Sequence, residues 1–305
     1  MSAAQSKTSE LARLRTEAPN PASAGLDTKS ALEIARIINT EDATVAAAVE
    51  RALPQVARAI DAIADAIRRG GRLIYVGAGT SGRIAALDAS ECPPTFNTDP
   101  KTVQFVMAGG TRALYSAVEA NEDSRALGRR DMAKRRPAKR DVVVGITASG
   151  RTPYTVAAVE YARQRGAKTV AITCNPGSPL ANAAHIAIVA EVGPEVLAGS
   201  SRMKAGTAQK LICNMLTTGA MARLGYVYGN LMVNVHLKNE KLIERGIGIL
   251  QKAAGVDRIQ AERALRAAEM SVPVALVMVT TGCSRAEAQR RLKAAKGNVR
   301  KAIGK

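Results

Sequence analysis

One stretch, residues 72–95, constrains the fold more than any other part of the sequence. It reads RLIYVGAGTSGRIAALDASECPPT. Its apolar run Leu73–Val76, followed by Gly-Ala-Gly, is typical of a buried parallel strand that enters a tight turn. Thr80, Ser81 and Gly82 stand where a helix should then begin. Hydroxyl groups and free N–H groups at such a helix start favour a bound phosphate, so we predict a phosphate-binding loop here.

The end of this helix is predicted from two consecutive prolines. Pro93 and Pro94 should stop the helix, because the residue before a proline disfavours helical backbone. Glu91 then falls at the helix end, beside the mouth of the strand. The partial negative charge of a helix C-terminus disfavours an ionised carboxylate, which would suit Glu91 to a role as a proton donor.

The same stretch matches the pattern G-x-G-x-x-G through Gly77, Gly79 and Gly82. A dinucleotide-binding unit also needs an acidic residue about 20 positions further on, to hold a ribose hydroxyl. The next predicted strand, Val103–Met107, ends in Ala-Gly-Gly without a carboxylate. The sequence therefore favours a phosphate cradle over a nicotinamide or flavin site.

Composition narrows the class of protein. The 305 residues carry a net charge of +18, which suits an anionic substrate or partner, but only 3% are aromatic and none is Trp. Few aromatic residues argue against a base-stacking surface for nucleic acid. The four Cys and the two His (His185 and His236) lack metal-ligand spacing. We expect a reduced, cytoplasmic protein with no disulfide framework, no metal, no signal peptide and no membrane span.

Strands and helices alternate through the middle of the chain. A further strand is expected at residues 103–107, strand–loop units at residues 141–152 and 169–178, and a last apolar strand at residues 186–192. Helices are expected between them at residues 111–134, 155–165 and after Pro179. This order predicts a parallel sheet covered by helices on both faces, a three-layer αβα sandwich of the flavodoxin type. Ligands of such sheets bind at the carboxyl ends of the strands.

Flanking helices complete the expected core. Before the first strand, helices are predicted at residues 30–39 and 45–69. After the last strand, they are predicted at residues 205–224 and 231–245.

Two further loops carry hydroxyl and basic side chains. In the loop of residues 147–153, TASGRTP, we select Ser149, Arg151 and Thr152 as anion ligands. The alternative for this loop is a capped helix start with Pro153 in its first turn. In the stretch GSSRMKAGT, we select Ser200, Ser201 and Lys204 as further contacts to sugar or phosphate. The alternative there is a capped helix start with solvated charges.

The remaining segments set the expected domains. Residues 1–15 are predicted to be a flexible tail and residues 16–250 a sugar-phosphate-binding domain. Residues 251–305 are predicted to be a small, ubiquitin-associated-like module of three short helices. The basic run Arg129–Arg136 is interpreted as a solvated helix face. A proline-punctuated arm at residues 16–21 either wraps a partner subunit or is a plain tail.

Seven segments together resemble the N-acetylmuramic acid 6-phosphate etherases, a family of the sugar isomerase (SIS) fold. They are TEAPNPAS, IINTEDATV, GAGTSGRIAALDASECPPTF, AVEANEDS, VVVGITASGRTPY, GSSRMKAGTAQKLICNML and GNLMVNVHLKNEKL. The resemblance covers nearly all of the chain from Thr16 onward. The SIS loops are shared with isomerases and sugar-phosphate sensors. The carboxylate segments DASECPPT and AVEANEDS single out the etherases.

The resemblance implies an activity, a substrate and two catalytic residues. Members cleave D-lactate from the sugar 6-phosphate by elimination and water addition, in peptidoglycan recycling, without a metal or redox cofactor. They form homodimers. The catalytic carboxylates match Glu91 and Glu122. Glu119, one helical turn before Glu122, is the alternative for the second position, and no family role attaches to His236.

Two rival functions share the fold. One is a non-catalytic sugar-phosphate sensor of the kind found in glucokinase regulatory proteins. The other is an aldose–ketose isomerase of the SIS group. Release of lactate would distinguish the etherase from both.

Overall fold

The computed structural model describes residues 16–116, 121–237 and 239–304. Contacts divide the chain into two compact units. The sheet unit comprises Met1–Ala89 and Lys101–Leu216, and the helical unit comprises Ser90–Pro100 and Thr217–Lys305. The predicted tail, residues 1–15, lies outside the described residues. The predicted domain boundary after residue 250 stays a prediction.

The sheet unit is built on five parallel strands, and the predicted α/β fold is confirmed. The strands pair in the order β2-β1-β3-β4-β5, which is the flavodoxin-like order. Their bounds are β1 Leu73–Gly77, β2 Val103–Met107, β3 Val142–Ile146, β4 Lys168–Thr173 and β5 Ile186–Val189. The carboxyl ends of β2, β1 and β3 lie level, since Gly77 of β1 pairs with Met107 of β2 and with Ile146 of β3.

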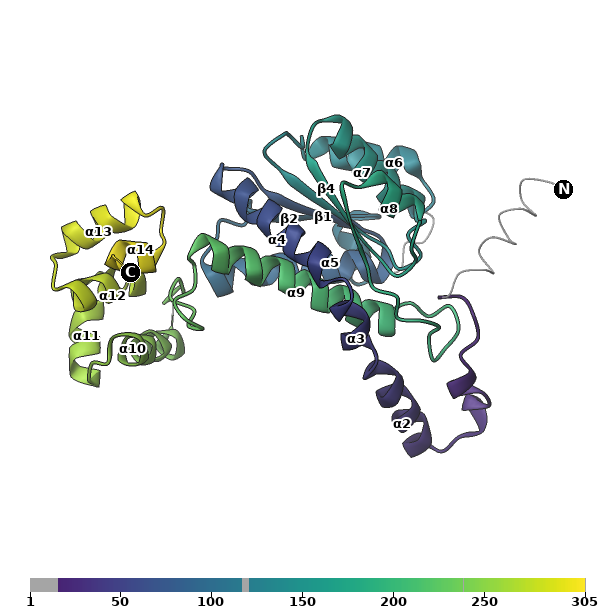
Figure 1. Ribbon diagram of the computed structural model, residues 1–305, viewed down its shortest axis with the longest axis horizontal. Helices are drawn as coiled ribbons and strands as arrows, with labels where there is room; N and C mark the ends of the chain where they lie inside the picture. Colours follow the sequence, from purple (N-terminus) through teal and green to yellow (C-terminus); the bar gives the residue numbers. More distant parts are fainter. Residues whose placement is uncertain (1–15, 117–120, 238, 305) are drawn as a thin grey trace. The chain divides into compact units, whose positions relative to one another are not determined.

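Helices cover both faces of the sheet, as expected for strands that are apolar on both sides. Figure 1 shows α6 Arg125–Lys134, α7 Pro153–Gln164 and α8 Pro179–Ala183 on one face. It shows α4 Leu53–Arg68, α5 Gly79–Phe96 and α9 Lys204–Leu224 on the other. Successive side chains of β1 point to opposite faces of the sheet. Ile74 and Val76 join the apolar cluster under α6 to α8, whereas Tyr75 on the other face hydrogen-bonds Asp88 of α5.

The long helix predicted over residues 45–69 is two helices. α3 covers Val45–Glu50 and α4 begins at Leu53. Pro54 in the first turn of α4 has no N–H group to continue the earlier helix. The predicted helix before them is α2, Ala31–Asp42, and a capping box of Ser30 and Glu33 starts it. Two short 3-10 turns, Pro21–Ser23 and Leu26–Thr28, precede α2.

The prediction that the prolines end the phosphate-loop helix is wrong. α5 runs through Pro93 and Pro94 to Phe96, and Asn97 N–H still bonds to Pro93 O at 2.8 Å. Cys92 and Phe96 are 2% and 5% exposed. Burial of these side chains therefore outweighs the local preference of proline. Glu91 is the thirteenth of the 18 helical residues rather than the last.

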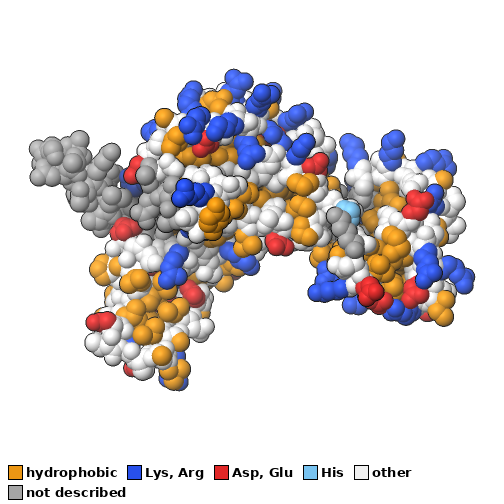
Figure 2. Space-filling model, turned by 180° about the vertical axis from the view of Figure 1, so that it is seen from behind, with side chains coloured by type: hydrophobic (Ala, Val, Ile, Leu, Met, Phe, Trp, Pro, Cys, Tyr) orange, Lys and Arg blue, Asp and Glu red, His pale blue; other side chains and the backbone are white. Residues whose placement is uncertain are grey.

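Among the described residues, the helix predicted over residues 111–134 is confirmed in its last part and differs in its first, and residues 117–120 lie outside the described residues. A 3-10 turn covers Gly110–Leu114, and α6 begins after Ser124, whose side chain accepts the N–H of Leu127. Arg129, Arg130 and Lys134 of the basic run are exposed on α6, and Figure 2 shows basic side chains spread over the top of the sheet unit, where α6 and α7 lie. This agrees with a solvated basic face.

The helical unit contains the short C-terminal helices that the sequence predicts. The three are α11 Arg258–Ala267, α12 Val272–Thr281 and α13 Arg285–Ala294, and a fourth short helix, α14 Val299–Ile303, follows them. They share one apolar core with α10, Glu240–Ala254. The helix predicted to begin at residue 231 begins only at Glu240, because Asn239 caps it, so the exposed His236 lies before the helix.

Candidate functional site

The site is set by the strand order. β1 and β3 are neighbours, but their connections leave toward opposite faces of the sheet, and such a switch point opens a crevice at the carboxyl ends of the two strands. The loops that follow β1 and β3 are the two in which the sequence predicts anion ligands. The sheet therefore brings Thr80, Ser81, Ser149 and Thr152 to one edge.

The first loop turns into α5 within two residues, and its glycines make that possible. A side chain on Gly77 would lie 2.9 Å from the N atom of Gly82. The backbones of Gly77 and Gly82 can therefore approach this closely only where side chains are missing. Gly79 has φ +53°, in the left-handed region that glycine adopts without strain. Thr80, Ser81 and Gly82 thus form the first turn of α5. The first N–H groups of a helix have no carbonyl partner within it and favour an anion, although the N–H of Gly82 already donates to Ala78 O at 3.2 Å.

The second loop is held by its own hydroxyls. Thr147 Oγ1 lies 2.8 Å from Thr152 Oγ1 and 3.4 Å from Ser149 Oγ, and Ser149 Oγ accepts the N–H of Arg151 at 3.2 Å. Thr152 precedes α7 as its N-cap residue but makes no capping hydrogen bond, because its hydroxyl is turned to Thr147. The alternative for this loop, a capped helix start with Pro153 in its first turn, is therefore only partly present. The helix begins at Pro153, but the Thr152 hydroxyl does not cap it.

The third stretch lies at the start of α9, next to the first loop. A side chain on Gly206 would lie 3.6 Å from the methyl group of Thr80. The cap of α9 is a residue that the sequence reasoning missed: the Glu195 carboxylate accepts the N–H groups of Lys204 and Ala205 at 2.8 and 2.9 Å. Glu195 is fully buried, and this burial raises the pKa of its carboxyl group. In the sequence, the one sign of this role is that Glu195 stands as a single charged residue between Pro194 and an apolar residue.

Lys204 is buried in an ion pair. Its Nζ lies 2.5 Å from Glu41 Oε2 at the end of α2, and its side chain is only 3% exposed. Asn20 Nδ2 donates to the same oxygen at 2.8 Å. The hydrogen bond from Lys204, more than that from Asn20, holds the pKa of Glu41 below its ordinary value. The ammonium group thus ties α9 to α2. Ser200 and Ser201 lie in the loop that leads into α9.

Of the two predicted catalytic carboxylates, Glu122 lies at the crevice. Its Oε1 is 3.0 Å from the position that a side chain on Gly79 would take, and its carbonyl oxygen accepts the N–H of Tyr154 in α7. Glu122 therefore stands between the starts of α5 and α7. Glu91 is exposed on α5 and belongs to the segment Ser90–Pro100 of the helical unit. Glu119 lies outside the described residues.

The histidines and cysteines form no metal site. No group of three His, Cys, Asp or Glu side chains that could hold a metal ion occurs within residues 16–116, 121–237 and 239–304. His185 is exposed beside β5, and its Nδ1 accepts the N–H of Thr169 at 3.1 Å. None of the four cysteines, all of which lie among the described residues, is in a disulfide. Burial raises the pKa of the Cys174 thiol to about 12.

None of the described helices is, by itself, long and apolar enough to cross a membrane. α11 and α12 reach that length and composition only as a pair, and the two are bent by 115° to one another.

Two known domain families match parts of this chain. Residues 55–163 match the glucokinase regulatory protein N-terminal SIS domain, and residues 127–219 match the SIS domain. An N-acetylmuramic acid 6-phosphate etherase of Vibrio vulnificus (strain YJ016) is 53% identical over 96% of this chain and 98% of its own. One of Escherichia coli O1:K1 / APEC is 53% identical over 97% and 99%. A solved phosphoheptose isomerase from Francisella tularensis is 21% identical, with a TM-score of 0.48, over 64% of this chain and 100% of its own.

Proposed function

The chain belongs to the N-acetylmuramic acid 6-phosphate etherases, and from this membership we propose its substrate and reaction. It is a carbon–oxygen lyase that cleaves the D-lactyl ether of N-acetylmuramic acid 6-phosphate. The products are N-acetylglucosamine 6-phosphate and D-lactate, so the reaction recovers sugar from the cell wall.

The observation that carries this proposal is the meeting of two hydroxyl-bearing loops and one carboxylate at the β1/β3 switch point. The first turn of α5 and the loop of residues 147–152 offer N–H and hydroxyl donors to the 6-phosphate. Glu122 stands between them, beside Gly79. A phosphate anchored by the two loops would place the sugar carbons near this carboxylate, as proton abstraction requires.

The proposed chemistry is an elimination followed by an addition. Opening of the sugar ring frees an aldehyde at C1, which acidifies the proton on C2. A base takes this proton, and the bond between C3 and the lactate oxygen breaks, with its electron pair going to that oxygen. The oxygen takes a proton, lactate leaves, and a double bond remains between C2 and C3. Water then adds its oxygen to C3 and a proton to C2.

These steps need one carboxylate that is ionised and one that is protonated. We assign Glu122 as the base, because it lies at the crevice beside the phosphate loops. Glu91 is assigned as the acid on the family resemblance alone. Its predicted place at the end of a helix does not support that role, since α5 continues to Phe96.

The remaining predicted ligands divide by their surroundings. Thr80, Ser81, Gly82, Ser149, Arg151 and Thr152 are proposed to bind the phosphate. Ser200 and Ser201 are proposed to contact the sugar, because α9 starts next to Thr80. Lys204 stays proposed as a ligand, although its ammonium group pairs with Glu41, so its contribution to an anion site would be electrostatic.

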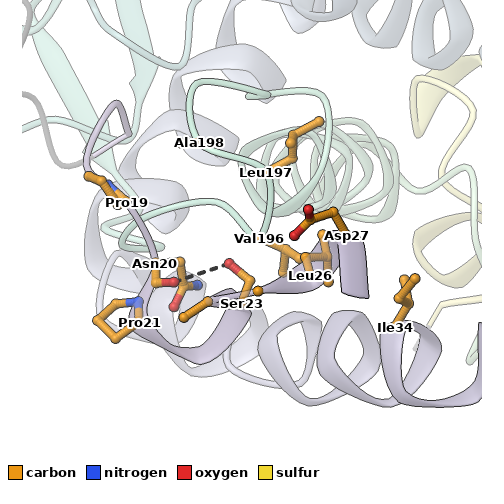
Figure 3. A pocket seen from close by; sticks show the side chains of 12 residues that line it. Pro19, Asn20, Pro21, Ser23, Leu26, Asp27, Ile34, Val196, Leu197 and Ala198 are labelled. Atoms are coloured by element: carbon orange, nitrogen blue, oxygen red, sulfur yellow. Dashed lines mark hydrogen bonds between the residues drawn. The ribbon is translucent and has the colours of Figure 1, made fainter. Parts of the chain in front are cut away.

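A homodimer is proposed from the apolar surface that the arm leaves uncovered. No residue of α2 is buried, and Leu32 on this helix is 59% exposed. A hollow of about 660 Å³ lies beside the arm, and Leu26, Ile34, Val196 and Leu197 are among the residues that line it. Figure 3 shows these side chains on the turn before α2, on α2 and on the 196–198 loop. Burying such apolar surface favours association. We propose that a second copy covers it and that residues cross the interface into the active site.

A cytoplasmic location is proposed from the chemistry of substrate and thiols. A phosphorylated sugar is a substrate of the cell interior, and four cysteines outside any disulfide suit a reducing compartment. No nucleic acid, membrane, metal or redox cofactor is part of the proposal.

One assay tests the proposed function against its two rivals. The protein is mixed with N-acetylmuramic acid 6-phosphate, and lactate and N-acetylglucosamine 6-phosphate are measured, with the Glu122→Gln variant as control. Equal amounts of both products from the wild type, and none from the variant, are expected. A ketose phosphate without lactate would indicate an isomerase, and binding without turnover would indicate a sensor.

A further inference from the structure

The loop after β4, residues 174–178, carries no role in the proposed reaction, yet it holds the substrate loop from behind. Ala148 lies directly before Ser149, and its carbonyl oxygen accepts three hydrogen bonds from this side. The donors are Cys174 N at 3.0 Å, Thr173 Oγ1 at 3.2 Å and Asn175 Nδ2 at 3.0 Å. A carbonyl oxygen has two lone pairs, so two donors would already satisfy it. The third donor therefore restrains the direction of the Ala148 carbonyl group more than the hydrogen-bonding capacity of its oxygen requires.

Holding this carbonyl sets the direction of the next N–H group. All described peptide bonds are trans, and in a trans peptide the C=O and N–H groups point in opposite directions. With Ala148 O directed at β4, the N–H of Ser149 is directed away from β4, toward the crevice. Within the described part of the chain this N–H makes no hydrogen bond.

Asn175 cannot act on the substrate itself. Its side chain is 5% exposed, and its Nδ2 lies 3.5 Å from the hydroxyl oxygen of Thr16, in the arm that covers it. The rest of the substrate loop is held from the same side. Leu180 N donates to Gly150 O at 2.9 Å, and a side chain on Gly150 would lie 2.1 Å from Ser178 Oγ. Of the two groups that Asn175 Nδ2 contacts, Ala148 O at 3.0 Å is the nearer and belongs to the substrate loop, so we expect the effect of Asn175 on the reaction to pass through Ala148.

We propose that Asn175 is a positioning residue: it holds the Ala148 carbonyl and thereby aims the N–H of Ser149 at the 6-phosphate. This rests on the proposed function for the identity of the anion. Preorganised donors bind an anion without the cost of ordering a loop. Losing one of three hydrogen bonds to the carbonyl should weaken phosphate binding about three- to tenfold and leave the chemical step unchanged.

The test compares Asn175→Ala with Asn182→Ala. Asn182 also donates its amide to a backbone carbonyl, Gly177 O at 3.2 Å, but it is exposed on α8. For Asn175→Ala we expect KM for the substrate, and the dissociation constant of N-acetylglucosamine 6-phosphate, to rise three- to tenfold with kcat within twofold. Asn182→Ala should match the wild type. An unchanged KM in a folded Asn175→Ala protein, or a fall in kcat alone, would overturn the proposal.

A second variant gives a measurement that a mere loss of side-chain packing at position 175 would not change. In Asn175→Asp, the ionised carboxylate cannot donate to Ala148 O, whereas the protonated form can. Its affinity for N-acetylglucosamine 6-phosphate, relative to that of the wild type, should recover as the pH is lowered. A ratio that stays constant with pH would contradict the proposal. This variant also keeps the test open should Asn175→Ala fail to fold.

A measurement without ligand separates this inference from the proposed function. Hydrogen exchange of the peptide that contains residues 147–152 should be faster in Asn175→Ala than in the wild type, while exchange in α9 stays unchanged. Faster exchange in Asn175→Ala, together with a wild type that binds no sugar phosphate, would contradict the proposed function alone. Unchanged exchange of this peptide would sink the positioning role.

Discussion

At the scale of single residues, the site depends on one contact between a glycine and a carboxylate. Gly79 has φ +53°, and its missing side chain leaves room for Glu122 Oε1, which is 3.0 Å from the place a Cβ would take. The glycine therefore does two things: it allows the turn into α5 and it admits the proposed base. The two effects can be separated by comparing glycines.

Gly79→Ala should lower kcat far more than it lowers stability. The added methyl group displaces the Glu122 carboxylate, in addition to a strain of about 1–2 kcal/mol from left-handed backbone. Gly70→Ala is the matched control, because Gly70 has φ +72° with nothing within 4 Å of its added Cβ. Both variants should lose similar stability in urea denaturation, and only Gly79→Ala should lose activity. Equal activity in the two would remove Glu122 from its proposed place.

The two proposed catalytic glutamates should differ in proton exchange. Glu91→Gln and Glu122→Gln should both abolish lactate release. Abstraction of the C2 proton precedes departure of lactate, so the Glu91→Gln protein should still exchange the C2 hydrogen of the substrate with deuterium oxide, followed by NMR. The Glu122→Gln protein should not. The opposite pattern would reverse the roles, and full activity in either variant would exclude that residue.

At the scale of elements, the sheet was predictable and the helix ends were not. Apolar runs such as Leu73–Val76 predict a buried strand in any context, and the alternation of strands and helices leaves few topologies. The end of α5 was missed because tertiary packing of Cys92 and Phe96 overrides the prolines. Glu195 was missed because it lies nine residues before the N–H group it caps, a distance set only by the folded loop.

The link between α2 and α9 should make stability depend on acid. The pKa of Glu41 is below its ordinary value of 4.5, so its contribution is complete above pH 4.5 and is lost as the pH falls through the lowered value. Glu41→Gln also leaves the Lys204 charge buried, which should cost about 3 kcal/mol at pH 7.

The difference in unfolding free energy between the wild type and Glu41→Gln should therefore shrink when denaturation is repeated below pH 4.5. Glu50→Gln, on the exposed surface of α3, serves as control and should match the wild type throughout. A difference that is independent of pH would show that the ion pair does not form.

At the scale of the whole molecule, the uncovered face of α2 predicts a dimer. Sedimentation at assay concentration should give twice the mass of the chain, 32.0 kDa. Leu32→Asp should shift the protein to monomer and reduce activity, because residues cross the proposed interface. Ile259 in α11 is 70% exposed, and Ile259→Asp should leave the dimer intact. An active wild-type monomer would contradict the proposed assembly.

The most direct test of the central claim is to follow isotopes from solvent into the products. The reaction is run with N-acetylmuramic acid 6-phosphate in deuterium oxide enriched in oxygen-18, and both products are analysed by mass spectrometry and NMR. Elimination across C2 and C3 predicts one deuterium on C2 and one oxygen-18 on C3 of N-acetylglucosamine 6-phosphate, with the original ether oxygen retained in lactate. Oxygen-18 in lactate, or no deuterium on C2, would contradict the elimination.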